Sequence, residues 1–304
     1  MKRITFVAPC LLALAACGGA PNTASMDELR AAVPRHEWLS MSLAEVRAPA
    51  PAMCASSGAS TFGTTTHQIA GTVDGVLAGV FGSIGQVTSQ PPAVKEPGQA
   101  MWGPIVGTSS VYTLAVQQVS ATEFNFFLGG EAKGAGDAWK GVFGGTTVVT
   151  DAQHRSGKVD VNFSVMHSLD ATVDPIAGGA AVRFSVNGGA RDVRAHFGGI
   201  IGKNAPQADD SDYAFTEAAD HTVGFAFATH MDYDHDGTLD EVVNIQSRWA
   251  ADGSGTAHVV VTGGSLGQRT VNAVECWNPA LERVFYTDDQ NANDRVGTPT
   301  CCPF

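Results

Sequence analysis

Residues 177–202 read AGGAAVRFSVNGGARDVRAHFGGIIG, and this stretch decides the fold that we expect. Within it the apolar side chains of Val182, Phe184 and Val186 alternate with polar ones, which is the period of a strand with one buried face. Gly-Gly pairs follow one another ten residues apart, at positions 178, 188 and 198. Because glycine adopts the positive φ angles of tight turns, we expect these pairs to be turns between antiparallel strands.

The same alternation continues on both sides of this stretch, from Trp102 to Tyr286. Further runs occupy 112–116, 124–126, 223–227, 243–249, 259–261, 271–273 and 284–286, and further Gly-Gly pairs begin at 129, 144 and 263. The runs predict about ten to twelve strands joined by hairpins. The fold class is therefore mainly β, an antiparallel meander that forms a barrel or a two-layer sandwich.

One segment before these strands has the helical period instead. From about Thr64 to Val87 apolar residues recur at intervals of three and four, and Gln90-Pro91-Pro92 ends the pattern. The segment also holds a GxxxGxxxG row and two later glycines, namely Gly71, Gly75, Gly79, Gly82 and Gly85. Each costs a helix about 0.8–1 kcal/mol relative to alanine, so we expect the helix to pack closely against the sheet. The alternative is a glycine row that pairs with another helix or enters lipid, although Asp74 argues against deep burial in lipid.

The first sixteen residues have the three parts of an export signal. Lys2 and Arg3 form a basic start, residues 4–13 are apolar, and residues 14–16 are Leu-Ala-Ala. Followed by Cys17, this exit resembles the lipobox of bacterial lipoproteins. The resemblance implies cleavage before Cys17 and lipidation of that cysteine, and Gly18 in place of an aspartate points to the outer membrane of the cell envelope. The alternative is an ordinary secretory signal.

The signal and the strand pattern divide the chain into three parts. Residues 1–16 are removed, and residues 17–60 hold the lipidated cysteine, a tether and short helical segments. Ser25 and Glu28 form a capping-box pattern, which predicts a short helix from Met26 to Val33. Residues 61–304 form the β-rich domain, which begins with the glycine-rich helix.

Four of the six cysteines remain after the signal and the lipidated residue are set aside. An oxidising compartment favours two disulfides among Cys54, Cys276, Cys301 and Cys302. Since a bond between the neighbours Cys301 and Cys302 is geometrically awkward, we expect Cys54 and Cys276 each to pair with one of them. Zinc is the competing interpretation, and the absence of a CxxC spacing disfavours it.

The net charge of −12 excludes one large class of partners. Nucleic-acid binding needs lysine and arginine to neutralise phosphates, so we expect no nucleic-acid partner. An acidic chain is also repelled by anionic lipid surfaces, so contact with the membrane is expected through the lipid anchor.

The best candidate for a binding site is the acidic stretch from Asp232 to Glu241, DYDHDGTLDE. It resembles the DxDxDG calcium loop, in which carboxylates at alternate positions converge on one ion and glycine permits a sharp turn. The resemblance implies structural Ca²⁺ ligands at Asp232, Asp234, Asp236, Thr238 and Asp240. Val243 replaces the closing glutamate of an EF-hand and the flanks are strands, so the EF-hand itself is excluded. A solvated acidic turn is the alternative, and a partial likeness to the HxHxDH motif of metallo-β-lactamase-fold hydrolases is weaker.

No catalytic motif stands out elsewhere. The sequence has no GxSxG elbow, no phosphate-binding glycine loop and no HExxH. Dispersed histidines could still meet in space with carboxylates, and the candidates are His154, His167, His196, His221 and His258. A hydrolase or other enzyme built this way is the alternative function.

Arg248-Trp249 and Glu275-Cys276-Trp277 resemble paired motifs of an uncharacterised group of predicted envelope lipoproteins. The resemblance brings no activity with it. The leading hypothesis is a lipid-anchored, non-catalytic binding or structural module stiffened by calcium and disulfides. Its expected partners are a small apolar ligand or another envelope protein.

Overall fold

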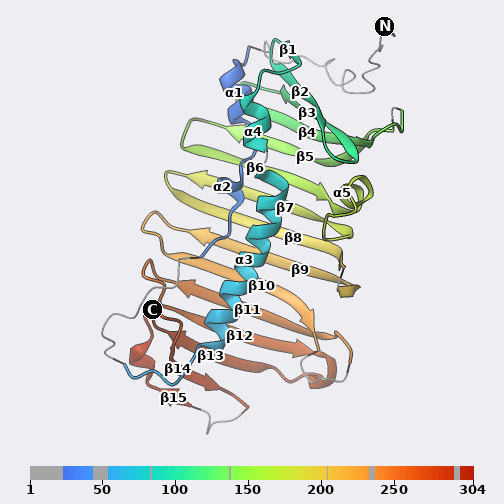
Figure 1. Cartoon of the computed structure of the whole chain (residues 1–304). Helices are drawn as coiled ribbons and strands as arrows, with labels where there is room; N and C mark the ends of the chain where they lie inside the picture. The colour runs from blue at the N-terminus through green and yellow to red at the C-terminus, as the bar shows by residue number, and fades with distance from the viewer. Residues whose placement is uncertain are drawn as a thin grey trace.

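The computed structural model describes residues 23–43, 54–82, 84–136, 138–203, 205–232, 237–290 and 295–304. In them fifteen strands form one antiparallel sheet, in which each strand pairs with the next along the chain (Figure 1). The strands are β1 (Val94–Glu96), β2 (Gln99–Val106), β3 (Ser110–Gln118), β4 (Glu123–Ala132), β5 (Lys140–Val149), β6 (His154–Asn162), β7 (Ala177–Asn187), β8 (Ala190–Gly202), β9 (Ala205–Glu217), β10 (Val223–Met231), β11 (Glu241–Trp249), β12 (Gly255–Gly263), β13 (Val271–Trp277), β14 (Arg283–Asp288) and β15 (Val296–Gly297).

The predicted mainly-β antiparallel meander with a helix packed against it is confirmed, with fifteen strands instead of ten to twelve. The sheet is open, because β1 and β15 are its two edges and do not close it into a barrel. Both edge strands are short, and β1 exposes Lys95 and Glu96, a combination that discourages pairing with another chain. The second layer consists of helices and not of a second sheet, since the helices already cover the apolar face.

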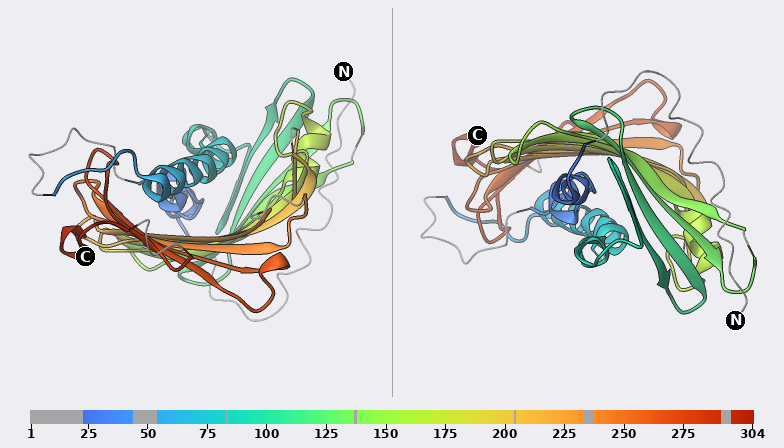
Figure 2. Two further views of the ribbon diagram at one scale, coloured as in Figure 1. Left: turned by 90° about the horizontal axis from the view of Figure 1, so that it is seen from below. Right: turned by 90° about the horizontal axis from the view of Figure 1, so that it is seen from above.

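Among the described residues, the helices that precede β1 lie in the concave face of the curved sheet (Figure 2). They are α1 (Met26–Ala31), α2 (His36–Leu39), α3 (Thr61–Phe81) and α4 (Ile84–Ser89). A fifth helix, α5 (Phe163–Leu169), lies in the connection between β6 and β7, and two short 3₁₀ segments, η2 (Gly264–Leu266) and η4 (Pro299–Cys301), follow later. The helix predicted over 64–87 is confirmed as helical, but it is divided into α3 and α4. The capping box of Ser25 and Glu28 begins α1 as predicted.

The core lies between the helices and the inner face of the sheet. Alternate strand residues are buried there, including Val182, Val193 and Phe225, each at most 1% exposed. Aromatic contacts join the two layers: the ring centroids of Phe81 on α3 and Phe143 on β5 are 5.4 Å apart. The other face of the sheet carries the intervening, mostly polar residues, and the helices do not cover it.

The expectation that every Gly-Gly pair is a turn is wrong. Gly188 and Gly189 form the β7–β8 hairpin turn, with φ angles of 57° and 94°. The pairs that begin at 129, 144, 178 and 198 lie inside strands, the last two at irregularities of the β7–β8–β9 register. At Gly145 a Cβ would lie 2.0 Å from the carbonyl oxygen of Lys158, so this glycine is required by close approach of the backbones. Gly-Gly pairs therefore serve two purposes among the described residues: they allow the positive φ angles of a hairpin turn, and they allow backbones to approach closely within the sheet.

The helix α3 packs against the sheet as predicted, but its glycine row takes no part in that packing. Gly71, Gly75 and Gly79 are exposed, and a Cβ built on any of them has no atom within 4 Å. The apolar residues of α3 form the opposite, buried side, with Val73, Leu77 and Phe81 among them. The helix is thus oriented by its apolar stripe, and the glycines lie on the side that faces away from the sheet.

Arg191 fastens the α2 segment to the sheet. Its guanidinium donates to the carbonyl oxygens of Glu37 at 2.8 Å and Ser40 at 3.1 Å. It is held in place by Glu217, whose Oε2 accepts from Arg191 Nε at 2.8 Å, while His221 Nδ1 lies 3.0 Å from Oε1. Burial acts to raise the pKa of Glu217, but its contacts with His221 and Arg191 outweigh that effect and lower the pKa below 4.5. The carboxylate is therefore favoured in the folded state.

This carboxylate predicts a pH-dependent contribution to stability. A group with a lowered folded pKa stabilises the fold above its ordinary pKa and loses that contribution as the pH falls through the folded pKa. We expect Glu217→Gln to lower the free energy of unfolding by about 1–2 kcal/mol at pH 7, and the difference from the wild type to narrow steadily below pH 4.5. Urea unfolding at pH 7 and pH 3 measures both values, with the edge-strand variant Glu96→Gln as control. A difference that does not change with pH would contradict this assignment.

Candidate functional site

Three cations lie side by side on the uncovered face of the sheet. Lys158 on β6 is directly opposite Arg183 on β7, and Arg183 is directly opposite Arg194 on β8. We call these three residues the cation row. All three are exposed, and with adjacent strands about 4.8 Å apart the row spans about 10 Å between its outer Cα atoms.

Like charges directly opposite one another destabilise a sheet. Neither Lys158 nor Arg183 forms an ion pair with any described residue, whereas Arg194 Nε lies 3.3 Å from Asp192 Oδ1. Asp160 on β6 and Asp212 on β9 lie on the same face near the row, and no described ion pair joins either of them to Lys158 or Arg183. The row thus places three cations next to one another in a chain of net charge −12.

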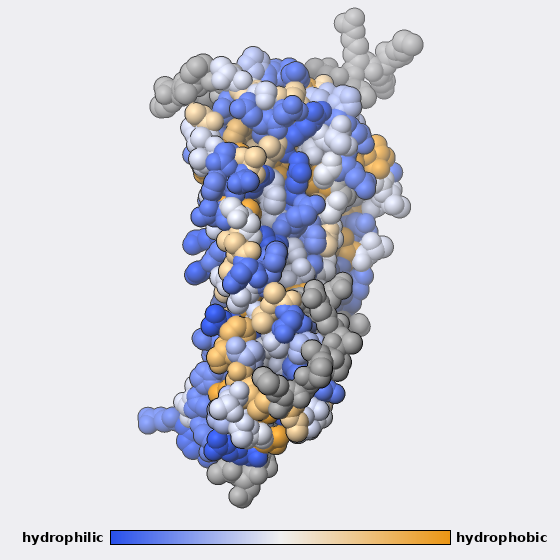
Figure 3. Space-filling view, turned by 90° about the vertical axis from the view of Figure 1, so that its left-hand side faces the viewer, coloured by the Kyte–Doolittle hydropathy of each residue, from blue (hydrophilic) through white to orange (hydrophobic). Residues whose placement is uncertain are grey.

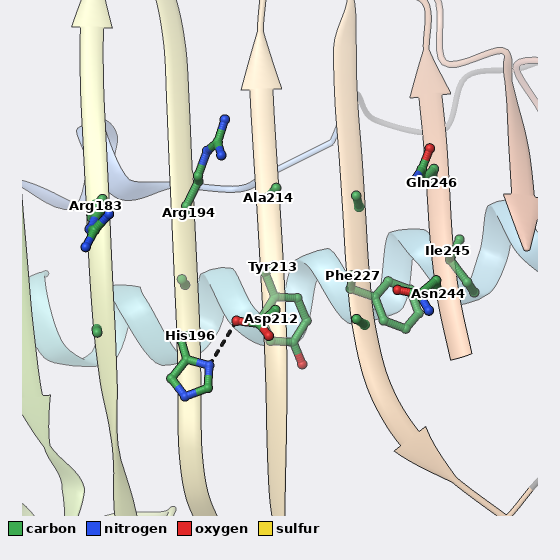
Figure 4. A pocket seen from close by; sticks show the side chains of 14 residues that line it. Arg183, Arg194, His196, Asp212, Tyr213, Ala214, Phe227, Asn244, Ile245 and Gln246 are labelled. Carbon is green, nitrogen blue, oxygen red and sulfur yellow. Dashed lines mark hydrogen bonds and ion pairs between the residues drawn. The ribbon is translucent and has the colours of Figure 1, made fainter. Parts of the chain in front are cut away.

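The cation row borders a hollow in the same face, over β7 to β11 (Figure 4). The hollow has a volume of about 420 Å³, within the range of about 300–1,000 Å³ that small-molecule sites occupy. It exists because Ala214 on β9 and Ala226 and Ala228 on β10 carry only methyl groups where longer side chains stand on the neighbouring strands. Figure 4 shows Arg194 and His196 on one side of it and Asn244 and Gln246 on the other.

One carboxylate lies inside the hollow. Asp212 on β9 is opposite His196 on β8, and His196 Nδ1 lies 2.9 Å from Asp212 Oδ1. Both side chains are more than half exposed, so the pair is solvated. The two arginines are the cationic groups of the lining, and Asp212 is its carboxylate. The arrangement offers charge, hydrogen bonds and a small apolar floor.

The histidines considered for catalysis do not converge. His154 Nδ1 contacts Asp151, His167 Nδ1 contacts the carbonyl oxygen of Val173, and His221 contacts Glu217. His196 on β8 and His258 on β12 are separated by four strand spacings, about 19 Å. This geometry gives the dispersed-histidine enzyme no support.

The predicted calcium loop connects β10 to β11. Asp234 and Asp236 lie outside the described residues, and Asp232, Thr238 and Asp240 lie within them. The N–H of Gly237, at a φ of 93°, donates to Asp232 Oδ2 at 3.0 Å, and Thr238 Oγ1 donates to Asp240 Oδ1 at 3.2 Å. Gly237 therefore has the positive φ that glycine adopts readily, and residues 233–236 lie outside the described residues. The described residues alone contain no group of three or more histidine, cysteine or acidic side chains placed to hold a metal.

The Glu275-Cys276-Trp277 segment fastens the start of α3 to the sheet. The Glu275 side chain is fully buried and accepts hydrogen bonds from Ser60 Oγ, from the Phe62 N–H at 3.0 Å and from Arg283 Nε at 2.9 Å. Next to it, Trp277 packs on Trp249 with ring centroids 4.7 Å apart. We call Glu275, Ser60 and Arg283 the helix clamp. Sequence analysis did not identify it, and the motif that contains Glu275 is structural.

The expected disulfide pattern is confirmed. Cys54 pairs with Cys301 and Cys276 pairs with Cys302, so each C-terminal cysteine takes one of the two earlier ones. The bonds tie the segment before α3 and the end of the chain to β13. The lipidation residue predicted at Cys17 lies outside the described residues.

A second, smaller cavity lies between the α3–α4 junction and strands β2 to β5. It has a volume of about 170 Å³ and an apolar lining that includes Val80, Ile84, Leu114 and Met166. This is close to the volume of an engineered apolar cavity that binds benzene, and it is well below that of most ligand sites.

The long side of the molecule seen in Figure 3 is mainly hydrophilic, with separate small apolar patches. Within the described ranges, no helix has the length and apolar character that crossing a membrane requires. No protein-family model matches this chain, and no curated protein and no solved structure matches it either.

Proposed function

We propose that this protein is a lipid-anchored, non-catalytic binding module of the cell envelope, which captures an anionic ligand on the uncovered face of its sheet. The observation that carries the proposal is the cation row beside the hollow of about 420 Å³. A row of like charges lowers stability, and binding of an anion would offset the repulsion. The helices cover only the concave face, which leaves the hollow accessible.

The position of the anchor supports this arrangement. The lipobox resemblance places the lipid on Cys17, and the N–H groups of Thr23 and Ala24 donate to Gln118 Oε1 at the end of β3. The six residues from Cys17 to Thr23 reach at most about 20 Å. The hollow is centred near β9, six strand spacings or about 29 Å from β3. The anchor would therefore keep the β3 end of the sheet within reach of the outer membrane, with the hollow about 29 Å from that point of attachment.

A Cys17→Ser variant tests the anchor. We expect the wild type to fractionate with membranes and to carry the mass of the acyl chains, whereas the variant should appear in the soluble envelope fraction without that mass. A variant that remains in the membrane fraction would contradict the lipid anchor and would leave the anion site untouched.

Inorganic polyphosphate tests the anion site. We expect the full-length protein in non-ionic detergent to bind it by titration calorimetry, with an affinity that falls as salt rises. Arg183→Gln/Arg194→Gln should weaken binding about ten-fold or more, since each lost charge-assisted hydrogen bond is worth about 1.5–3 kcal/mol. The matched control, Lys95→Gln/Arg269→Gln, removes the same charge from other exposed positions. Equal binding by the two double variants, or no binding by the wild type, would contradict the proposal.

We also propose that the β10–β11 loop binds a structural Ca²⁺ ion, because its carboxylate spacing and the turn at Gly237 suit that ion. At a calcium concentration about five-fold above the dissociation constant, binding stabilises the fold by about 1 kcal/mol. A chelator should then lower the melting temperature of the wild type and leave that of Asp234→Ala unchanged. Asp252→Ala, in another hairpin turn, should keep the chelator effect. A wild type that is insensitive to chelator would contradict the calcium site.

The 170 Å³ cavity favours a second candidate, the binding of a small apolar ligand. Its volume limits the ligand to about the size of benzene. We expect the wild type to bind a benzene-sized probe and Val80→Trp, which fills the cavity, to abolish that binding. The matched control is Ala78→Trp, two residues away on the same helix, which should leave the binding intact. Equal binding by the two variants would contradict this candidate.

A further inference from the structure

The two walls of the hollow differ in chemistry. On β8, Arg194 and His196 stand at its edge with Arg183 one strand behind, whereas on β11 the edge is formed by Asn244 and Gln246. Arg194, Ala214, Ala226 and Gln246 are successive cross-strand partners, so both walls belong to one row of the sheet. Three strand spacings separate the walls, about 14 Å between Cα atoms. A ligand that fills the hollow would meet guanidinium groups at one end and amides at the other.

The floor between the walls is flat and weakly apolar. Ala214 and Ala226 are directly opposite, and Ala228 lies two residues farther along β10. The methyl groups of these alanines give a shallow surface of C–H groups, and the Asp212 side chain stands beside it as the cross-strand partner of Ala228. Such a floor suits the C–H face of a saturated ring, while it is too small to bury a hydrocarbon chain.

The hydrogen-bonding groups of the two walls narrow the class of ligand that the hollow can bind. Arginine side chains bind carboxylates with two parallel N–H···O bonds, and the amides of Asn244 and Gln246 can both donate to and accept from hydroxyl groups. The one carboxylate in the lining, Asp212, is paired with His196 at 2.9 Å. An isolated inorganic anion would use only the arginines. A molecule that uses both walls would carry a negative group at one end and, at the other, groups such as hydroxyls that hydrogen-bond with amides.

We propose that the hollow binds an acidic saccharide, with a sugar carboxylate on Arg183 and Arg194, a ring over the alanine floor and hydroxyls on Asn244 and Gln246. This inference rests on the proposed capture of anions and names the class of ligand. The sugar comes either as a free monosaccharide or as a unit of a polymer. Lys158 extends the positive charge beyond the hollow to a second acidic unit of a polymer.

Calorimetric titration of the full-length protein in non-ionic detergent tests the inference with four probes: galacturonate, trigalacturonate, neutral galactotriose and inorganic phosphate. We expect trigalacturonate to bind more tightly than galacturonate if the ligand is a polymer unit, and equally if it is a free sugar. Both uronates should bind more tightly than phosphate or galactotriose. Arg183→Gln/Arg194→Gln should weaken uronate binding about ten-fold or more, and Lys95→Gln/Arg269→Gln should leave it unchanged.

Two further variants separate the saccharide from a bare anion. Ala226→Leu fills the floor and Asn244→Ala removes an amide from the far wall, so each should weaken trigalacturonate binding while leaving polyphosphate binding intact. Uronate binding no tighter than that of phosphate, or insensitivity to both variants, would overturn the saccharide assignment. Polyphosphate binding without uronate binding would also overturn the saccharide assignment, but it would leave the anion-binding function supported. If neither polyphosphate nor uronate binds, both the saccharide assignment and the anion-binding function are overturned.

Discussion

Glu275→Ala is expected to lower the free energy of unfolding by about 3–5 kcal/mol, the usual cost of removing one partner from a buried ion pair. The carboxylate of Glu275 is fully buried, and it accepts hydrogen bonds from Arg283 Nε, from Ser60 Oγ and from the first N–H groups of α3. The variant leaves the Arg283 guanidinium, whose side chain is 23% exposed, without its counter-charge. It also removes the negative charge that complements the helix N-terminus.

Urea unfolding gives the free-energy difference, and amide hydrogen exchange localises it. Because the clamp holds the N-terminal end of α3, exchange should accelerate first at Phe62 and Gly63, while amides at the centre of β8 stay protected. Glu275→Gln keeps the shape of the side chain and loses its charge. The free energy of unfolding of this variant should therefore lie between that of the wild type and that of the alanine variant. Glu96→Ala, on the exposed edge strand, should change stability by less than about 0.5 kcal/mol. A cost below about 1 kcal/mol for Glu275→Ala would mean that the clamp does not hold the helix.

The strands could be predicted because their signal is local. In each run, such as Val182-Arg183-Phe184, the period of two predicts which side chains are buried. Short connections favour pairing between strands that are adjacent in the sequence. Closure of the sheet has no local signal, since it depends on how the edges meet and on what covers the inner face. The same holds for the orientation of α3. Its glycines are unfavourable in any helix, and only the three-dimensional packing shows that Gly63 contacts the sheet side whereas Gly71 does not.

The candidate site could not be predicted for a related reason. Lys158, Arg183 and Arg194 each occupy an ordinary polar position in an alternating run, and they form a row only through the register of three strands. A shift of one residue in either register would separate them onto opposite faces. A usable signal was the presence of cations at the centres of successive strands of an acidic protein. The helix clamp was missed because Ser60 and Glu275 are 215 residues apart, whereas the disulfides were predictable because few cysteines allow few pairings.

The variant Gly71→Ala/Gly75→Ala/Gly79→Ala is expected to raise the free energy of unfolding by about 2–3 kcal/mol. Alanine is favoured over glycine in a helix interior by about 0.8–1 kcal/mol per position, chiefly because it restricts the unfolded chain. The gain is realised only where the added methyl group fits. At these three positions a Cβ meets no atom within 4 Å, so no contact opposes the gain.

Gly63→Ala in the same helix is the matched control. Its Cβ would lie 2.6 Å from Ser60 Oγ and 2.9 Å from Trp277 Cδ2, so the same substitution should cost about 1–3 kcal/mol through overpacking. Urea unfolding of the two variants and the wild type under one buffer condition measures the opposite signs. A loss of stability in the triple variant would show that the glycine row contacts another surface in the purified protein. A gain would mean that the exposed glycines of α3 lower the stability of the natural fold.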